Sequence, residues 1–136
     1  MKISTKGRYA LRVLIDLAEQ QNDNFIPLKE IAARQEISEK YLENILKVLV
    51  HNNVLTGMRG KGGGYRLTKS AEELSVGSIL RLTEGDLAPV TCLEHEAALC
   101  SRAENCRTLP MWKNLNVLVN RFFDNITLAD LMEGLE

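Results

Sequence analysis

The sequence predicts a mainly α-helical protein with one small β-hairpin and a long C-terminal helix. Apolar residues recur at intervals of three and four along most of the chain, which is the periodicity of helices with one buried face. A glycine-rich segment between two short β-prone runs predicts the hairpin, and an apolar band after Pro110 predicts the long helix. A chain of 136 residues is long enough for one folded domain with an appended element.

The first predicted helix covers residues 6–20. Its apolar positions lie between Ala10 and Ala18 at helical spacing, and Ser4 or Thr5 can cap its N-terminus. The polar run at residues 21–24 is expected to end it.

Two further helices follow, with a short joint between them. Pro27 is expected to open a helix that ends near Glu36, because proline is tolerated in a first turn. Ser38 then caps a helix that runs to about Asn52 and packs through leucine and isoleucine side chains. The opposite face of this third helix carries long polar side chains, namely Lys40, Glu43, Asn44, Lys47 and His51.

The hairpin is predicted from β-prone runs at residues 54–56 and 65–68, on either side of a loop at residues 57–64. This loop contains five glycines together with Arg59 and Lys61. Glycine permits a tightly turned backbone, so we expect a thin tip that presents two cations.

The rest of the chain combines helices with an irregular loop. Ser75 caps a predicted fourth helix, which Gly85 ends. Residues 86–109 show neither helical nor strand periodicity. Pro110 starts the last long helix, whose apolar band is wider than a terminal helix needs against one small domain, and Thr127 caps a final turn.

A net charge of −1 conceals an asymmetry along the chain. Residues 1–83 carry a charge of +4, and residues 84–136 carry a charge of −5. A local basic stripe on an otherwise acidic protein indicates a polyanionic partner that is met at one place. Between residues 40 and 69 a single acid, Glu43, faces six cations: Lys40, Lys47, Arg59, Lys61, Arg66 and Lys69.

Taken together, these elements are the plan of a winged helix-turn-helix. A helix fits the major groove of DNA, where Lys, Asn and Glu reach base edges, and a cationic wing suits the minor groove or a phosphate ridge. Taken alone, the polar helix face would more often be solvated surface, but the adjoining hairpin favours binding. A phosphate-binding nucleotide loop is the rival explanation of the glycine-rich segment, but neither GxxxxGK[ST] nor GxGxxG occurs. We therefore expect a DNA-binding domain at residues 1–83, followed by an irregular loop at residues 84–109 and a long helix with a final turn at residues 110–136.

All three cysteines, Cys92, Cys100 and Cys106, lie in the irregular loop with the spacing C-x7-C-x5-C. An odd count and the lack of a signal-peptide pattern disfavour structural disulfides, so metal or redox chemistry is expected. Thiolates bind zinc and iron-sulfur clusters alike, but the C-x2-4-C pairs of structural zinc sites and the HExxH motif are absent. A cluster would need a fourth ligand, for which the candidates are a side chain of a partner subunit, a small molecule, His95, Glu94, Glu96 or Glu104.

Several stretches of the sequence resemble a known family. They are residues 1–10 (MKISTKGRYA), residues 37–43 (ISEKYLE), the wing at residues 59–65 (RGKGGGY) and residues 125–128 (NITL). In combination they resemble the Rrf-two family of transcription regulators, whose members include IscR, NsrR and CymR, over essentially the whole chain.

The resemblance implies a homodimeric repressor in which the long helix, residues 110–123, crosses its partner and sets two wings on a palindromic operator. It makes residues 84–109 a sensor loop and residues 110–136 a dimerisation helix with a final turn. It also implies that cluster supply, nitric oxide or oxidation is sensed through cluster ligands at Cys92, Cys100 and Cys106. The DNA contacts implied by the resemblance are Ser38, Lys40, Tyr41, Glu43, Arg59, Gly60 and Lys61, to which the polar face of the third helix adds Asn44 and Lys47.

The sequence departs from the family pattern at two positions. IscR-like members carry a histidine three residues after the last cysteine, where this chain has Leu109, and NsrR-like members carry an acid near the N-terminus, where it has Arg8. A 2Fe-2S cluster and a 4Fe-4S cluster therefore both stay open. So does a cluster-free, thiol-based regulator of redox state or cysteine metabolism.

Enzymes and membrane proteins are the disfavoured classes. No nucleophile–base pair and no glutamate beside a three-ligand metal site can be recognised, so an enzyme such as a zinc hydrolase is not expected. Uncharged stretches are short, and residues 1–7 lack a signal-peptide core, so we expect a cytoplasmic protein.

Overall fold

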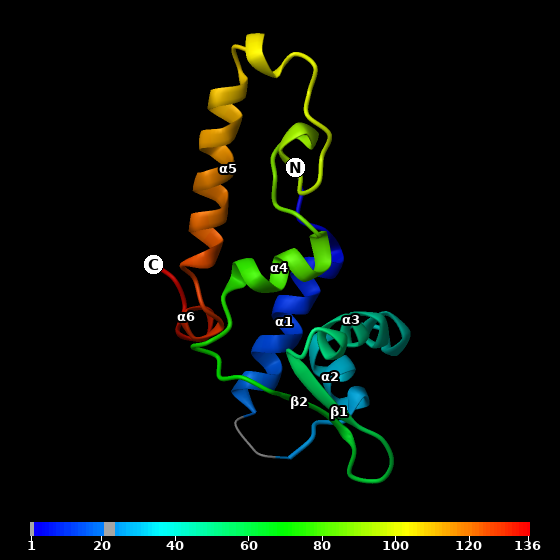
Figure 1. Cartoon of the computed structure of the whole chain (residues 1–136). Coiled ribbons are helices and arrows are strands. Elements are labelled where there is room, and N and C mark those ends of the chain that lie inside the picture. The colour runs from blue at the N-terminus through cyan, green and yellow to red at the C-terminus, as the bar shows by residue number, and fades with distance from the viewer. Residues whose placement is uncertain (1, 21–23) are drawn as a thin grey trace.

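The computed structural model describes residues 2–20 and 24–136, so most of the polar run expected to end the first helix lies outside the described residues. Figure 1 shows a helical body that carries the hairpin, and a long helix and a loop that extend from this body to one side. In the part of the chain that the structure describes, no helix has the length and apolar character needed to cross a bilayer.

Four helices form the body: α1 (Thr5–Glu19), α2 (Leu28–Gln35), α3 (Glu39–His51) and α4 (Val76–Glu84). The mainly α-helical class is confirmed, and each of these helices lies within one or two residues of its predicted range. Pro27 is the N-cap of α2 and precedes the helix, rather than occupying its first turn.

Short polar side chains begin most of the helices, as the sequence predicts. In each case the side-chain oxygen accepts the N–H group three residues further on, which satisfies one of the unpaired donors of a first helical turn. Thr127 and Asp130 form a reciprocal capping box. The capping residues are Ser4 at α1, Ser38 at α3, Ser75 at α4 and Thr127 at α6 (Leu128–Glu133).

The wing is an antiparallel pair of strands, β1 (Leu55–Met58) and β2 (Gly64–Leu67), which pair from Leu55 opposite Leu67 to Met58 opposite Gly64. The strands therefore extend further toward the tip than predicted, and the tip is confined to residues 59–63. A bridge between Ile26 and Tyr65 ties the wing to the segment before α2, through two hydrogen bonds of 2.9 Å each.

One apolar core holds the body together. It joins the inner faces of α1, α2, α3, β1 and α4, and Leu128 of α6 also enters it. This first core cluster supplies most of the hydrophobic stabilisation, since burial of each large aliphatic side chain contributes about 1.5 to 3 kcal/mol. Its fully buried large side chains include Leu14, Ile31, Leu42, Ile45, Leu46, Leu49, Leu55, Ile79 and Leu128.

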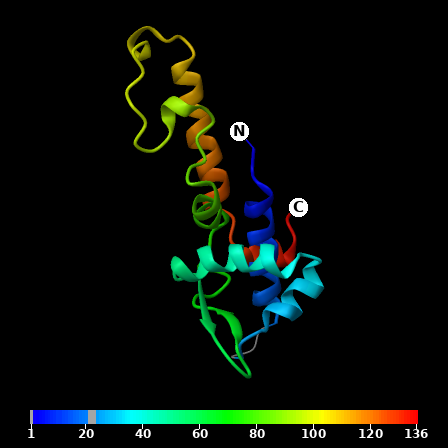
Figure 2. The same ribbon diagram turned by 90° about the vertical axis from the view of Figure 1, so that its right-hand side faces the viewer.

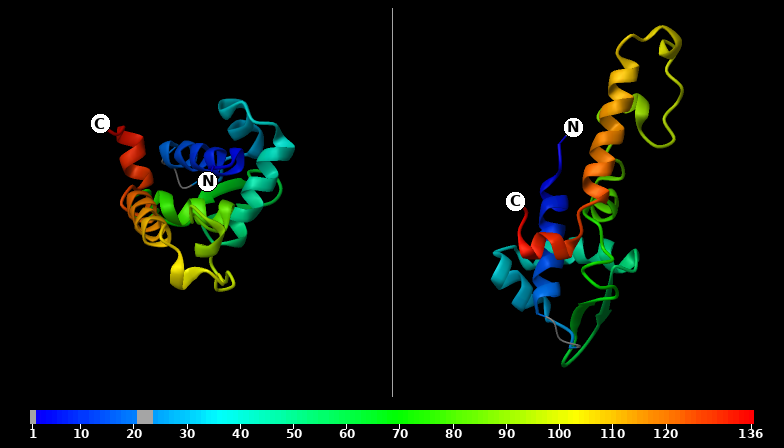
Figure 3. Two further views of the ribbon diagram at one scale, coloured as in Figure 1. Left: turned by 90° about the horizontal axis from the view of Figure 1, so that it is seen from above. Right: turned by 90° about the vertical axis from the view of Figure 1, so that its left-hand side faces the viewer.

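A second core cluster, Val76, Leu80 and Leu87, receives Val119 and Phe123 of the long helix α5 (Leu109–Asp124). Only this end of α5 meets the body, and Figure 3 shows the rest of α5 standing out from it beside the loop. Within the loop, residues 86–108 form two short 3-10 turns, Thr91–Leu93 and Ala103–Asn105.

Candidate nucleic-acid interface and cysteine loop

Helix α3 separates apolar and polar side chains onto opposite faces. Leu42, Ile45, Leu46 and Leu49 are buried in the first core cluster, so the residues between them are turned outward. Figure 2 shows α3 lying across one side of the molecule, with the wing below it on the same side. The predicted contacts on this outward face, Lys40, Glu43, Asn44 and Lys47, are all exposed, as is His51.

The wing tip presents the other predicted cations to solvent. Arg59, Gly60 and Lys61 are exposed. Gly60 and Gly62 have φ values of +91° and +78°, which side chains with a Cβ rarely adopt. The two cations therefore stand on a narrow turn that depends on glycine.

Ser38 and Tyr41, two further predicted contacts, lie at the N-terminal end of α3, where Ser38 is exposed and Tyr41 is half-buried. The hydroxyl of Ser38 accepts the N–H of Tyr41 at 3.2 Å, so it serves as a helix cap. The ring of half-buried Tyr41 meets the ring of Tyr9 edge to face, with centroids 5.8 Å apart. A shallow cleft of about 460 Å³ lies here, lined by these three residues with Thr5, Glu36 and Ile37.

A buried carboxylate in α1, Asp16, holds the end of α2. Its side chain is 4% exposed and accepts three hydrogen bonds from Arg34, at 2.8 Å from Nη2 and at 3.0 and 3.2 Å from Nε, and one of 2.8 Å from Gln35. Burial acts to raise the pKa of Asp16, but the hydrogen bonds from Arg34 and Gln35 and the charge of Arg34 outweigh it and lower the pKa below its usual value. Asp16 and its partners were not among the predicted functional residues, although an acid on the apolar face between Val13 and Leu17 is a signal that a buried partner is required.

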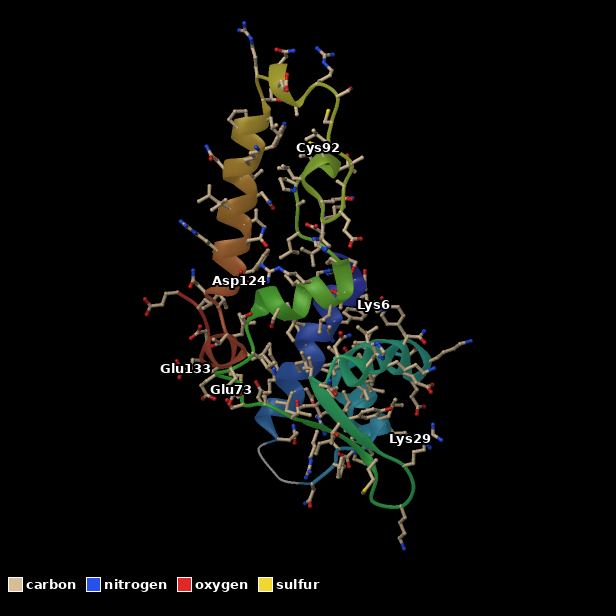
Figure 4. The ribbon with its side chains drawn as sticks, viewed as in Figure 1. Lys6, Lys29, Glu73, Cys92, Asp124 and Glu133 are labelled. Atoms are coloured by element: carbon tan, nitrogen blue, oxygen red, sulfur yellow. The ribbon has the colours of Figure 1, made fainter. Side chains whose placement is uncertain are left out.

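The three cysteines are free thiols in the irregular loop. Cys92 and Cys100 are exposed and Cys106 is half-buried. Figure 4 shows Cys92 at the opposite end of the molecule from the wing. Among the described residues, no three His, Cys, Asp or Glu side chains lie close enough together to hold a metal ion. In this arrangement the predicted ligands are not brought together, and the residues do not fit a cluster.

Cys106 differs from the other two thiols in its surroundings. Its Sγ lies 3.5 Å from the hydroxyl of Thr108, and this contact is the largest of the influences that lower the pKa of the Cys106 thiol. The backbone N–H groups of Thr108 and Leu109 and the charge of Arg102 act in the same direction, while burial opposes them. A lower pKa increases the thiolate fraction at neutral pH, and the thiolate is the reactive form.

Glu84, the last residue of α4, and Asp86, two residues further on, hold the start of α1 and part of the loop. Asp86 accepts the N–H groups of His95 at 2.6 Å and Ala88 at 2.7 Å, and the bond from His95 is the main reason that its pKa is lowered. Glu84 accepts both the N–H and the hydroxyl of Ser4, at 2.5 and 2.9 Å. The start of α1 and the loop are therefore held by two acids, Glu84 and Asp86, that lie two residues apart in the sequence.

Arg81, one turn earlier, joins α4 to α5. Its guanidinium donates to both oxygens of Asp124, at 2.8 and 2.9 Å, and to Asn120 at 2.6 Å. A polar cleft of about 400 Å³ lies between this contact and the loop, lined by Arg81, Asp86, His95, Asn116 and Asn120 among others.

Comparison with known proteins gives this arrangement a family. The sequence profile of Rrf2, described as an iron-dependent transcriptional regulator, matches residues 3–134. The chain belongs to the Rrf2 family. The HTH-type transcriptional regulator IscR of Erwinia tasmaniensis is 35% identical to this Rrf2 chain over 136 residues, which are all of the chain and 81% of that protein.

Solved structures of Rrf2-like regulators have the same fold. CymR, the global cysteine regulator of B. subtilis, superposes with a TM-score of 0.79 at 34% identity, covering 100% of this chain and 99% of that one. The IscR of T. potens gives a TM-score of 0.76 at 32% identity, covering 100% and 89%. An oxidised form of CymR from Staphylococcus aureus gives 0.73 at 35% identity, covering 100% and 99%. This Rrf2 chain is therefore an IscR-like transcriptional regulator with a winged-helix fold, and not an enzyme.

Proposed function

We propose that the protein is a sequence-specific repressor that binds a palindromic operator in double-stranded DNA as a homodimer. The observation that carries this proposal is the outward polar face of α3 beside the glycine-based wing, on one side of the molecule. A helix face of this kind suits the major groove, and a cationic turn of this width suits the minor groove.

Within this proposal the predicted contacts divide by position. The outward residues of α3, Lys40, Glu43, Asn44 and Lys47, would reach base edges, and Ser38 and Tyr41 at the start of the helix would meet the sugar-phosphate backbone. Arg59, Gly60 and Lys61 would enter the minor groove, where a backbone without Cβ atoms allows close approach.

The exposed side of α5 supports the homodimer. Met111, Leu118 and Phe122 are 53%, 64% and 62% exposed, and with Leu115 they recur at intervals of four and three residues. This spacing is that of a coiled-coil seam, in which two copies bury the same apolar stripe against each other. An apolar stripe of this length on an exposed helix indicates a protein partner.

We further propose that the cysteine loop is the sensor, responding to cluster status, nitric oxide or redox state through Cys92, Cys100 and Cys106. Its support is the concentration of three free thiols in one segment that is attached to α4 through Asp86. Because these thiols do not converge in the described arrangement, a 2Fe-2S or 4Fe-4S cluster would require the loop to take another shape.

A cluster-free thiol regulator is the second candidate, and Cys106 favours it. The lowered pKa of this thiol favours its reactive thiolate form without any metal. Similarity to CymR, which regulates cysteine, is consistent with this alternative.

DNA binding is tested by a gel shift with two probes, a duplex selected by the protein from a random-sequence pool and an unselected duplex of equal length. We expect the selected duplex to be retained at a concentration at least about 1,000-fold lower, as is typical of specific regulators. Equal retention of the two duplexes would contradict the proposal.

The sensing chemistry is tested by iron and sulfide analysis of protein purified without oxygen. Stoichiometric iron and acid-labile sulfide with visible absorbance would support a cluster. A colourless protein whose thiols cross-link on mild oxidation, together with a change in DNA affinity, would support the thiol regulator. A colourless protein whose DNA affinity is unchanged by oxidation would contradict both.

A further inference from the structure

The joint between α2 and α3 is short. Only Glu36 and Ile37 separate the last residue of α2, Gln35, from the N-cap of α3, Ser38. Glu36 has a left-handed backbone with φ 55°, and Ile37 is buried with its N–H bonded to Ala32 O at 3.1 Å. With so little chain between the helices, a displacement of Gln35 is transmitted to the start of α3.

Helix α1 holds Gln35 at three of its groups. The side-chain amide donates to Asp16 at 2.8 Å, the amide oxygen accepts from Arg12 Nε at 3.2 Å, and the main-chain carbonyl accepts from Arg12 Nη2. Arg12 also lies over the ring of Tyr9, 4.8 Å from its centroid, and Tyr9 contacts Tyr41 in the first turn of α3. Contacts from α1 therefore fix the chain on both sides of the joint.

Asp16 is the buried centre of this arrangement. Each of its carboxylate oxygens accepts two hydrogen bonds, three from Arg34 and one from Gln35 in total, and no buried side-chain polar atom among the described residues lacks a partner. A buried carboxylate with all its acceptor positions filled has one favourable geometry, because any shift leaves a charge unpaired. Asp16 itself is too deeply buried to meet a ligand, so any effect on DNA must act through the residues that it holds.

We propose that Asp16 is a positioning residue for DNA recognition: it fixes the orientation of α3 through Gln35 and so determines the preference for the operator. This inference rests on the proposed DNA-binding function. Hydrogen bonds to base edges need side chains within a fraction of an ångström of their partners, whereas attraction to phosphates acts over a Debye length and tolerates displacement. Loss of the Asp16 contacts is therefore expected to weaken specific binding and to spare non-specific binding.

The test compares Asp16→Asn with the wild-type protein on two probes, the duplex that the wild type selects from a random-sequence pool and an unselected duplex of equal length. Asparagine keeps the size of the side chain but removes the charge that holds Arg34. We expect affinity for the selected duplex to fall by about tenfold, the discrimination of one good base contact, and affinity for the unselected duplex to change by less than about twofold.

Two further variants keep the result interpretable. Ile79→Val removes one methylene from the same core, in α4, and controls for a general loss of stability. Arg34→Lys keeps the positive charge and loses the two-pronged geometry, so it should lower the preference in the same direction if Asp16→Asn does not fold. Circular dichroism and urea melts establish that each variant is folded under the binding conditions.

Three outcomes decide the inference. The inference is supported if the preference for the selected over the unselected duplex falls in Asp16→Asn and is unchanged in Ile79→Val. A preference that is unchanged in a folded Asp16→Asn or Arg34→Lys, or that falls equally in Ile79→Val, overturns it. If the wild type itself shows no preference between the duplexes, the proposed function fails, which is distinguishable from failure of the positioning role alone.

Discussion

At the scale of the residue, three aspartates each fix a different contact of the body. Asp16 joins α1 to α2, Asp86 joins α4 to the cysteine loop, and Asp124 joins α5 to α4. The pKa of each is lowered, because the N–H donors that surround it favour the ionised form. Only Asp16 is buried, so it is the one whose ionisation has the largest consequence for stability.

Removal of the Asp16 charge should alter how the free energy of unfolding depends on pH. The folded pKa of Asp16 lies below its unfolded value of about 4, so the ionised group stabilises the protein above that pH, and this stabilisation is lost as the pH falls through the folded pKa. We expect Asp16→Asn to lower the free energy of unfolding by about 2 kcal/mol at neutral pH, reduced from the cost of breaking a fully buried pair because Arg34 is 36% exposed. Urea melts of both proteins between neutral and acid pH measure the difference in their free energy of unfolding. A difference that does not shrink below about pH 4 would contradict the assignment of this stabilisation to the Asp16 charge.

Among the predicted contacts, Arg59 at the wing tip is the side chain whose loss we expect to lower the affinity for DNA most directly. If it makes a good contact in a groove, Arg59→Ala should weaken binding to the selected duplex by about 1 to 3 kcal/mol. Lys113→Ala removes a positive charge from an exposed position on α5 and is the control. Titration of both variants by gel shift checks the expectation, and unchanged affinity of Arg59→Ala would remove this residue from the interface.

At the scale of the element, the sequence predicts best what local chemistry determines. Ser38, Ser75 and Thr127 cap helices where they were expected to, because capping needs only residues three positions apart. The polar face of α3 was likewise visible from periodicity. Contacts between distant segments could not be predicted in this way. Nothing in the sequence pairs Asp16 with Arg34, and the loop around Cys92 has no periodicity from which its shape could be predicted.

The hairpin illustrates the same limit. Its strands include Gly57, Met58 and Gly64, which were expected to lie in the turn, because the ladder continues one pair beyond Gly57 opposite Tyr65 to Met58 opposite Gly64. A Cβ at position 64 would lie 2.1 Å from Ile26 O, so only glycine allows the wing to meet the segment before α2.

Gly64→Ala should therefore displace the wing and destabilise the protein by about 3 kcal/mol, through backbone collision together with a positive φ. Gly62→Ala is the matched control: its φ is also positive, but a Cβ there meets open space, so we expect a loss of about 1 kcal/mol. Thermal unfolding of the two variants gives the comparison. Equal melting temperatures of the two variants would show that the close approach of Gly64 to Ile26 does not contribute to stability.

At the scale of the whole molecule, α5 contacts the body at one end and solvent along the rest of its length. The side of α5 that carries Val119 and Phe123 packs on the second core cluster, while Leu118 and Phe122 are left outside. A helix with two apolar sides and only one of them covered is the expected form of a subunit that pairs with its copy.

Leu118→Glu should convert the dimer into monomers, because it places a charge in the middle of the proposed seam. Lys113→Glu also introduces a negative charge, at an exposed position on another side of α5, and should leave the proposed dimer intact. Sedimentation velocity distinguishes the two species. A wild-type protein that sediments as a monomer at micromolar concentration would contradict the proposed homodimer.

Neither core cluster has a member between residues 88 and 108, although the structure describes every residue of that stretch. The segment that carries the thiols can therefore be rebuilt, oxidised or exchanged for another sequence of similar span without emptying any packed interior. If this segment is the sensor that we propose, a different sensing loop could be grafted onto the same DNA-binding scaffold between Asp86 and the start of α5.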